Sequence, residues 1–289
     1  MSFMSDFQIL SGLHDIADEY DAIICDVWGV LHNGRAPFLA AADALRTFRE
    51  RRGPVVLLSN APRLVATLMK QFEHIGVPTD CFDAVVTSGV AARNELAARA
   101  RGKTLAMFHL GPERDCDVFE GLPGIEKVAE DDAEIVLCTG LFDDDHETPQ
   151  DYVERLAKLK ERSLTMLCAN PDMVVQRGGQ LVYCAGALAK EYETIGGDVV
   201  YFGKPYPAIY DLTLETMRKT GGRTVTRVLA VGDGMATDLA GANAMGFDAL
   251  FVAHGIHAAE LGEVTHESLA QLFEKTGVRA RAAMRELVW

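Results

Sequence analysis

Carboxylates placed at the ends of apolar runs are the residues best suited to chemistry in this chain. Residues 22–25 are apolar, Asp26 follows them, and Gly29 then allows the chain to turn. Such a run is typical of a strand buried in a parallel sheet, where ligands bind beyond the carboxyl ends of the strands. Asp26 could therefore act as a nucleophile, as a metal ligand or as both. The structural alternative is that Asp26 only begins a turn.

Two more carboxylates follow a later run of the same kind. Residues 228–231 lead through Gly232 to Asp233, and Asp238 stands at the start of the next expected helix. Together with Asp26 they would form an all-oxygen site, which suits a hard cation such as Mg²⁺. The structural alternative here is a turn aspartate followed by a capping aspartate.

Two other strand-like runs end on groups that would suit a phosphate. Ser59 and Asn60 follow the run 54–58 and precede an expected helix, whose first N–H groups could bind an anion. Lys204 follows another such run, and a fixed ammonium would neutralise charge on both nucleophile and substrate. Helix capping by Ser59 and Asn60, and a solvated loop charge at Lys204, are the structural alternatives.

In this order the four segments resemble the motifs of the haloacid dehalogenase-like (HAD) hydrolase superfamily, over roughly residues 20–255. The residues that match its motifs position by position are Asp26, Ser59, Lys204, Asp233 and Asp238. Three segments look like the class IIA branch, with its p-nitrophenyl-phosphatase-like and sugar- or nucleotide-phosphatase-like enzymes: Gly29-Val30-Leu31, Gly203-Lys204-Pro205 and Asn170-Pro171-Asp172. The resemblance implies a Rossmann-like core with a large α/β cap inserted between its second and third motifs.

The resemblance also implies a metal-assisted nucleophilic mechanism. Asp26 would attack phosphorus and form an aspartyl-phosphate, which water would then hydrolyse. Mg²⁺ would be bound by Asp26, by the backbone carbonyl of Trp28 and by Asp233, with Asp238 bound directly or through water. The metal would orient the nucleophile and offset its repulsion from the phosphate.

The remaining motif residues would bind the phosphoryl group. Ser59 and backbone amides near Trp28, Gly29 and Asn60 would hold the transferring oxygens, and Lys204 would complete the clamp. The cap would close over the site, exclude water and contact the rest of the substrate. The implied substrate is a small phosphorylated metabolite. Because related caps often mediate dimers, the resemblance also allows a homodimer.

One position departs from the family pattern. The aspartate that usually protonates the leaving group stands two residues after the nucleophile, and here that position is Trp28. An indole cannot act as a general acid, a role typically worth about 10²- to 10⁴-fold in rate. We therefore expect weak activity, or activity restricted to activated esters, unless another residue such as His32 supplies the proton.

Two other functions are compatible with these residues. Carbon- or phosphonate-directed chemistry is suggested by dehalogenase relatives, which carry an aromatic residue at the position of Trp28. A metal-free enzyme, however, would not need both Asp233 and Asp238. The main alternative is a non-catalytic or regulatory protein that keeps the fold and binds a small phosphorylated ligand. A test of magnesium dependence on phosphatase substrates would separate the three.

The elements that must position these residues follow from an alternation of two patterns. Strand-like runs are expected near residues 22–28, 54–58, 83–87, 198–202, 227–232 and 248–253. Helical patterns are expected near residues 38–52, 62–76, 206–220 and 235–245. This alternation predicts an α/β fold with a doubly wound parallel sheet.

A second series of strands and helices lies between about residues 89 and 186. Its strands are expected at 104–109, 134–139 and 164–169, with a helix over 150–162. An insertion with its own strands and helices is a domain rather than a loop. We therefore expect an inserted α/β cap domain at residues 89–186 and a core formed by residues 1–88 and 187–289.

The composition is that of an ordinary globular protein, with 289 residues, 48% hydrophobic and 24% charged, which is enough for two domains. A net charge of −14 argues against a nucleic-acid-binding surface. Since no run approaches the roughly 20 apolar residues of a membrane span and the N-terminus lacks a secretory pattern, we expect a cytoplasmic protein. Six cysteines without metal-binding spacing predict reduced, buried thiols.

Two other groups of residues have simple structural explanations. Asp143, Asp144, Asp145 and His146 are typical of a solvated helix start, with a small role in specificity left open. Trp289 and the helical pattern before it indicate packing against the core or against a partner.

Overall fold

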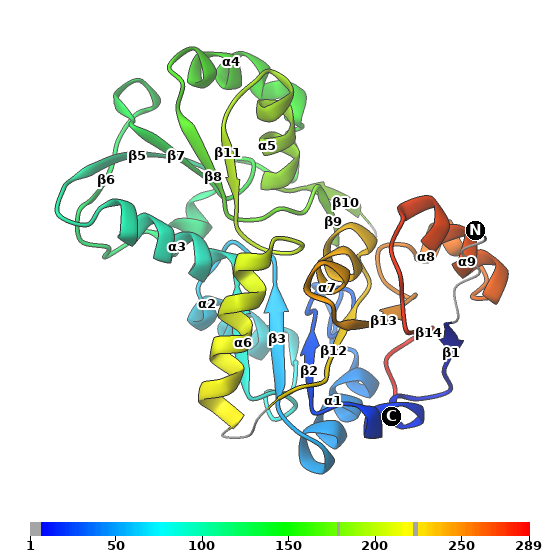
Figure 1. Ribbon diagram of the computed structural model, residues 1–289. Helices are drawn as coiled ribbons and strands as arrows, with labels where there is room; N and C mark the ends of the chain where they lie inside the picture. The colour runs from blue at the N-terminus through cyan, green and yellow to red at the C-terminus, as the bar shows by residue number, and fades with distance from the viewer. Residues whose placement is uncertain (1–6, 178–179, 222–224) are drawn as a thin grey trace. The chain divides into compact units, whose positions relative to one another are not determined.

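The computed structural model of the protein describes residues 7–177, 180–221 and 225–289. Its contacts divide the chain into two compact units, and most of their helices and strands are labelled in Figure 1. The first unit comprises Met1–Ser59, Met69–Val86 and Lys204–Trp289. The second unit comprises Asn60–Leu68 and Thr87–Gly203.

A seven-stranded sheet forms the first unit, in the order β1-β14-β13-β12-β2-β3-β4. Its strands are β1 (Gln8–Ile9), β2 (Ala22–Cys25), β3 (Val55–Ser59), β4 (Ala84–Thr87), β12 (Val228–Gly232), β13 (Asp248–Val252) and β14 (Ala282–Met284). In the centre of the sheet β2 pairs in parallel with both β12 and β3, so that Ile23 lies opposite Leu229 and Val55. The predicted α/β fold with a parallel sheet is confirmed.

From β2 onward, helices lie between successive strands of this sheet along the chain, as expected of a doubly wound fold. They are α1 (Leu39–Arg51), α2 (Val65–Ile75), α6 (Pro207–Gly221), α7 (Ala240–Met245), α8 (Ala258–Leu261) and α9 (His266–Thr276). Two short 3₁₀ turns, Leu13–Asp15 and Ala17–Glu19, precede β2, and a π-helical turn, Met235–Leu239, precedes α7. The helix expected over 235–245 therefore begins with a π-helical turn, which is wider than a turn of α-helix. After α9 the chain returns to the sheet as β14.

Burial explains why these sequences form these elements. Every residue of β2, β3 and β12 is buried, as expected of strands covered on both faces. On α1 the buried residues recur at helical spacing and include Leu45 and Phe48, so one face of the helix packs against β3. The helix α9 is capped at its start by Thr265, whose side chain accepts a hydrogen bond from the N–H of Ser268, and at its end by Gly277 with φ +70°.

The second unit contains a five-stranded parallel sheet in the order β11-β8-β7-β5-β6 and a separate antiparallel pair, β9 and β10. Its strands are β5 (Leu105–Leu110), β6 (Ile125–Lys127), β7 (Ile135–Cys138), β8 (Thr165–Cys168), β9 (Val174–Arg177), β10 (Gln180–Tyr183) and β11 (Val199–Tyr201). Its helices are α3 (Ser88–Arg99), α4 (Val153–Glu161) and α5 (Ala185–Thr194). Three 3₁₀ segments complete it: Glu113–Val118, Glu130–Asp132 and Pro149–Tyr152.

The position of β11 differs from the expectation that residues 198–202 form a core strand. Val199 pairs with Met166 of β8, so β11 extends the sheet of the second unit, and residues 187–203 group with that unit. The pattern of apolar residues indicates a strand but does not specify its partner, which is the physical reason for the difference. Residues 60–68 also group with the second unit, although the sequence places them directly after a core strand.

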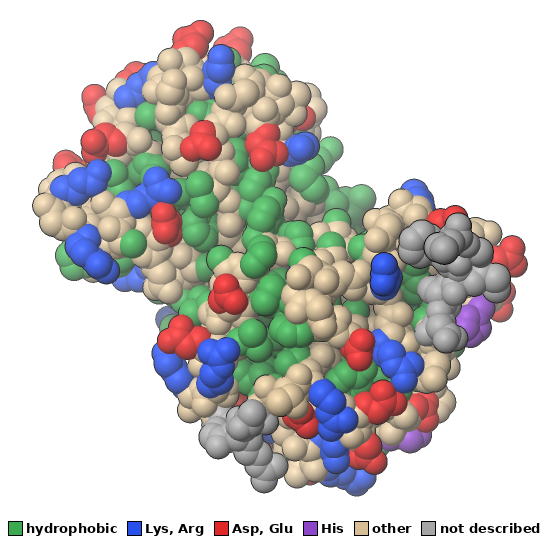
Figure 2. Space-filling model, viewed as in Figure 1, with side chains coloured by type: hydrophobic (Ala, Val, Ile, Leu, Met, Phe, Trp, Pro, Cys, Tyr) green, Lys and Arg blue, Asp and Glu red, His purple; other side chains and the backbone are tan. Residues whose placement is uncertain are grey.

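Several expectations from composition can be compared with the structure. All six cysteines are buried free thiols, and burial raises the pKa of Cys138 to about 12. Within the described ranges, no helix combines the length and apolar character that a membrane crossing requires. On the face shown in Figure 2, Lys and Arg side chains lie interspersed with Asp and Glu on each unit.

Candidate active site

The parallel order of three central strands brings candidate residues to one edge of the first unit. Asp26 follows β2, Ser59 ends β3, and Asp233 follows β12. Because β12, β2 and β3 are neighbours that run in the same direction, their carboxyl ends meet there. The N–H of Asp26 donates to the carbonyl of Val231 at 2.8 Å, which extends the β2–β12 pairing up to Asp26. Asp26, Ser59 and Asp233 are all buried.

Three carboxylates converge at this edge. One oxygen from each of Asp26, Asp233 and Asp238 lies within 4.8 Å of the others. Backbone amides orient two of them: Ile256 N–H donates to Oδ2 of Asp233 at 2.7 Å, and Gly234 N–H donates to Oδ2 of Asp238 at 3.0 Å. The arrangement is a set of closely spaced hard oxygen ligands.

Lys204 joins this cluster from the start of the segment that leads to α6. Its Nζ donates to Oδ1 of Asp26 and, at 2.6 Å, to Oδ1 of Asp238. The side chain is 4% exposed, so both ion pairs are largely removed from solvent. Burial and the neighbouring charge of Asp238 raise the pKa of Asp26 well above its usual range, and Lys204 opposes that shift. Three carboxylates and one ammonium leave an excess of negative charge, which a divalent cation would balance.

Glycines allow the backbone to approach these carboxylates closely. A Cβ atom on Gly29, where φ is +87°, would lie 2.2 Å from Oδ2 of Asp233. A Cβ on Gly255 would lie 1.8 Å from the same oxygen, and one on Gly232 would lie 2.2 Å from Cγ of Asp238. The loop after β13, which carries Gly255, was not identified from the sequence because no chemistry-bearing side chain marks it.

Trp28 is held by its neighbours rather than loosely exposed. A Cβ on Gly34 would lie 2.5 Å from Cη2 of the indole, and the ring of His32 meets the indole edge to face with centroids 5.1 Å apart. The side chain is partly buried. The indole therefore occupies a defined position two residues after Asp26.

His32 does not meet the expectation that it could supply a proton. It is fully buried, and its Nδ1 accepts a hydrogen bond from the N–H of Gly34 at 3.0 Å. Burial lowers the pKa of His32 to about 4, so the imidazole is neutral at physiological pH. Its ring also packs against Phe72. Because the ring is enclosed and uncharged, His32 is a core residue and is not placed to act as a general acid.

Asn60 and the triplet that ends in Asp172 come together in the second unit. The side-chain amide of Asn60 donates to Oδ1 of Asp172 at 2.9 Å, and the hydroxyl of Ser88 donates to Oδ1 of Asn60 at 3.4 Å. The N–H of Asp172 in turn donates to the side chain of Asn170 at 3.0 Å. The sequence marked Asp172 only through a family motif and did not indicate its partner.

The acidic run near residue 144 is paired within the second unit. Asp144 accepts hydrogen bonds from Arg114 and, at 2.7 Å, from Arg177, and Asp143 bonds the ring of His146. These pairs explain the run structurally, and none of its members joins the described carboxylate cluster.

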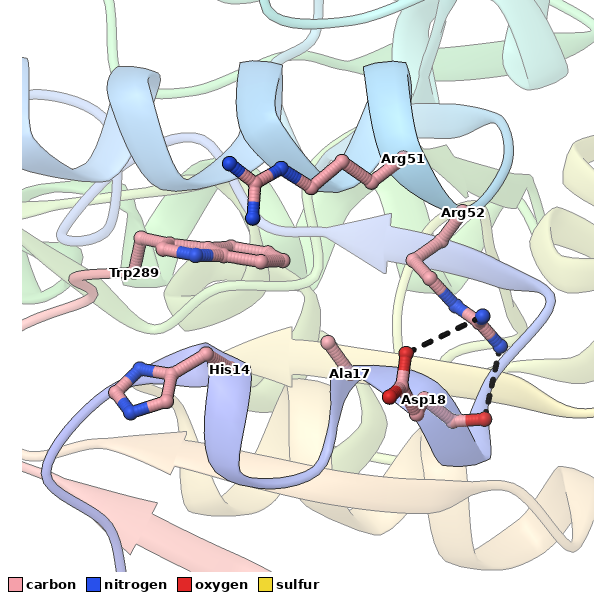
Figure 3. A pocket seen from close by; sticks show the side chains of 6 residues that line it. All are labelled: His14, Ala17, Asp18, Arg51, Arg52 and Trp289. Atoms are coloured by element: carbon pink, nitrogen blue, oxygen red, sulfur yellow. Dashed lines mark hydrogen bonds and ion pairs between the residues drawn. The ribbon is translucent and has the colours of Figure 1, made fainter.

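A separate pocket lies at the opposite edge of the first unit, near the amino ends of the strands (Figure 3). It is lined by His14, Ala17, Asp18, Arg51, Arg52 and Trp289. The guanidinium of Arg51 lies 5.4 Å above the ring of Trp289, and Arg52 pairs with Asp18 at 3.2 Å. Trp289 thus packs beside the end of α1, in agreement with the expected packing against the core.

Comparison with known proteins places these features in a family. A family model described as "Haloacid dehalogenase-like hydrolase" matches residues 23–123, and one described as HAD-hydrolase-like matches residues 201–274. A haloacid dehalogenase-like hydrolase from Brucella suis 1330 has a crystal structure that is 39% identical, covers 97% of this chain and 100% of its own, and superposes with a TM-score of 0.86.

Two relatives carry more specific names. The ribonucleotide monophosphatase NagD of Escherichia coli (strain K12) is 25% identical over 82% of this chain and 89% of its own. The crystal structure of glycerol phosphate phosphatase from Mycobacterium tuberculosis in complex with magnesium is 24% identical over 83% of this chain and 70% of its own, with a TM-score of 0.62, a likeness that concerns the fold. With the Brucella suis relative covered over its whole length at 39% identity, the chain belongs to the haloacid dehalogenase-like hydrolase family.

Proposed function

We propose that this protein is a Mg²⁺-dependent phosphatase of a small phosphorylated metabolite, acting through an aspartyl-phosphate on Asp26. The observation that carries the proposal is the convergence of Asp26, Asp233 and Asp238, with Lys204 bonded to two of them. A nucleophile, cation ligands and a fixed ammonium are the groups that phosphoryl transfer needs in one place. The relatives support the reaction class, since two of them are named as phosphatases.

The donor set suits magnesium. Carboxylate oxygens of Asp26 and Asp233 and the backbone carbonyl of Trp28 would bind the ion, with Asp238 bound directly or through water. The backbone carbonyl remains a ligand whatever side chain residue 28 carries. When bound, the ion would neutralise charge on the carboxylates and on the phosphate. The glycerol phosphate phosphatase structure with magnesium is consistent with this choice of metal.

The proposed reaction has two displacements at phosphorus. An oxygen of Asp26 forms a bond to phosphorus while the ester P–O bond breaks, and the leaving oxygen takes a proton from solvent. Water then attacks the phosphorus of the aspartyl-phosphate, which releases inorganic phosphate and restores the Asp26 carboxylate. Lys204, already bonded to Asp26, balances negative charge in both steps.

The phosphoryl oxygens would be bound next to the nucleophile. We assign this role to the Ser59 hydroxyl at the end of β3 and to backbone amides near Trp28, Gly29 and Asn60. We assign to the second unit the role of a cap that contacts the rest of the substrate and excludes water. Its independent sheet supports its treatment as an inserted domain.

Trp28 limits which esters would react quickly. The indole has no acidic proton to give, and the enclosed, neutral His32 does not replace it. Nitrophenolate and acyl-phosphate carboxylates leave without protonation, whereas sugar and alkyl alkoxides do not. We therefore propose weak turnover overall and a preference for activated esters.

Activity against p-nitrophenyl phosphate, a glycerol phosphate and a nucleoside monophosphate, each with Mg²⁺ and with a chelator, tests the proposal. We expect hydrolysis of p-nitrophenyl phosphate that needs Mg²⁺ and disappears with the chelator. Hydrolysis at the same rate in the chelator would contradict the metal-dependent mechanism.

A second candidate function, non-catalytic binding of a small phosphorylated ligand, is favoured by one observation, the fixed position of Trp28 where the acid would stand. It predicts that Mg²⁺ and inorganic phosphate bind but that no substrate is turned over and no phosphorylated Asp26 forms. Calorimetry together with acid-quench detection of the aspartyl-phosphate separates the two candidates.

A further inference from the structure

The segment that follows Ser59, to which we assign phosphoryl binding, is anchored by carboxylates of the second unit. Residues 60–68 group with that unit, although Ser59 itself ends a strand of the first. The 3₁₀ segment Glu113–Val118 contributes two of the carboxylates, Asp115 and Asp117. A third is Asp172, which accepts the hydrogen bond from Asn60 at 2.9 Å.

One of these attachments is an ion pair whose carboxylate is buried. Nε of Arg63 donates to Oδ1 of Asp115 at 2.9 Å, and the side chain of Asp115 is only 3% exposed. Removing one member of such a pair is destabilising, because the remaining group loses the partner that offset its desolvation. Asp115 therefore restrains the chain four residues after Ser59.

Other hydrogen bonds fix the backbone of the same segment. Thr87 Oγ1 donates to the carbonyl of Arg63 at 2.6 Å, and the N–H of Gly89 donates to the carbonyl of Ala61 at 3.1 Å. A Cβ on Gly89 would lie 2.4 Å from the nitrogen of Arg63, so the first turn of α3 lies directly against the segment. The loop from Asn60 to Arg63 is thus held on both its side chains and its backbone.

The start of α2 is held in the same way. Oδ2 of Asp117 accepts from the N–H of Leu64 at 3.3 Å and from the hydroxyl of Thr67. A carboxylate at this place accepts from the N–H of the residue just before the helix and interacts favourably with the helix dipole. The restraint on the loop therefore extends from Asn60 into the first turn of the helix.

We propose that Asp115 is a positioning residue for Ser59: by anchoring Arg63 it fixes the loop that begins at the peptide bond after Ser59, and so sets the affinity for the phosphoryl group. This inference rests on the proposed function, in which Ser59 binds phosphoryl oxygens. Asp115 does not touch the substrate itself. Since Ser59 would contact those oxygens in both the bound substrate and the transition state, loosening it raises KM more than it lowers kcat.

The variant Asp115→Asn tests this with a nearly isosteric change that removes the charge. Its matched control is Glu130→Gln, which neutralises another ion-paired carboxylate of the second unit, bonded to Arg155 at 2.6 Å and remote from residues 60–68 in the contacts described. For Asp115→Asn we expect about a tenfold rise in KM for p-nitrophenyl phosphate and in the inhibition constant of inorganic phosphate, with kcat within about twofold. Glu130→Gln should leave both affinities unchanged.

Two further measurements separate positioning from a general loss of structure. Amide hydrogen exchange should increase in peptides covering residues 59–68 in Asp115→Asn and stay constant in peptides covering α4. In a Ser59→Ala background, Asp115→Asn should change phosphate affinity less than in the wild-type background, because the hydroxyl is gone and only the backbone amide near Asn60 remains to be positioned. If Asp115→Asn does not fold, Arg63→Lys tests the same ion pair by changing its other, more exposed partner.

Three results would each overturn the inference alone. The first is equal exchange at residues 59–68 in Asp115→Asn and in wild type, and the second is a phosphate affinity of Asp115→Asn equal to that of Glu130→Gln. The third is an affinity loss that is as large in the Ser59→Ala background as in the wild-type background. A wild-type protein that neither hydrolyses p-nitrophenyl phosphate nor binds phosphate would instead contradict the proposed function, and the inference would fail with it.

Discussion

Gly29 lies so close to Asp233 that a Cβ atom on residue 29 would stand 2.2 Å from the carboxylate oxygen Oδ2. The turn after β2 and the loop after β12 are therefore in contact at the place where the carboxylates converge. Glycine satisfies two requirements there, since the φ of +87° also disfavours any residue with a side chain. The metal geometry that we propose depends on this contact.

Gly29→Ala should reduce Mg²⁺ affinity by about tenfold or more, because the added methyl group displaces the Asp233 carboxylate. Gly76→Ala is the matched control, since Gly76 has φ +86° but a Cβ atom added there would meet nothing within 4 Å. Both variants should lose about 1 kcal/mol of stability from backbone strain. Calorimetric titration with Mg²⁺ measures the affinities, and equal values for the two variants would show that the contact is irrelevant to the metal.

Asp26→Asn should lower the rate of p-nitrophenyl phosphate hydrolysis at least about 10³-fold, because an amide is a poor nucleophile. The fold should persist, since the change removes one of three mutually repelling buried carboxylates. Asp43→Asn, on the exposed face of α1, is the control and should keep wild-type activity. An Asp26→Asn protein that hydrolyses the ester at the wild-type rate would disprove the nucleophile assignment.

Trp28→Asp should raise the rate on an alkyl phosphate more than the rate on p-nitrophenyl phosphate, because only the alkoxide needs a proton to leave. Trp28→Phe is the control, since it keeps an aromatic ring and adds no acid. The ratio of kcat/KM for the two substrates is the measurement. Efficient wild-type hydrolysis of an alkyl phosphate would mean that the missing acid is supplied elsewhere or is not needed.

His109 should make the protein less stable in mild acid. It is buried in the second unit, with its Nε2 bonded to Thr139 at 2.8 Å, and burial lowers its pKa from 6.5 to about 4. Below pH 6.5 the unfolded chain therefore binds a proton that the folded protein does not accept until about pH 4, so this contribution to stability is lost as the pH falls through that range. The expected loss from this residue is about 2 kcal/mol at about pH 5.

Urea denaturation of wild type and His109→Gln at about pH 7.5 and about pH 5 measures this effect. The glutamine keeps a polar group near Thr139 but does not titrate, so its free energy of unfolding should change less between the two pH values. The same pH dependence in both proteins would show that His109 is protonated without cost in the folded state.

Local sequence patterns predicted the α/β class, the strand ends that carry Asp26, Ser59 and Asp233, and a second series of strands. These features depend on local patterns, because apolar runs of strand length predict buried strands, and parallel strands place their carboxyl ends at one edge. The absence of an acid at Trp28 could also be read directly from the residue type.

Local patterns did not predict which groups meet, and the folded arrangement of the chain shows this. Lys204 bonds both Asp26 and Asp238, β11 joins the sheet of the second unit, and His32 is enclosed rather than available to substrate. The ion pair between Arg63 and Asp115, which are 52 residues apart in the chain, could not be predicted from the sequence either. The periodicity of a segment reports whether it is buried, but not which distant segment covers it. That choice depends on packing and charge pairing among residues far apart in the chain.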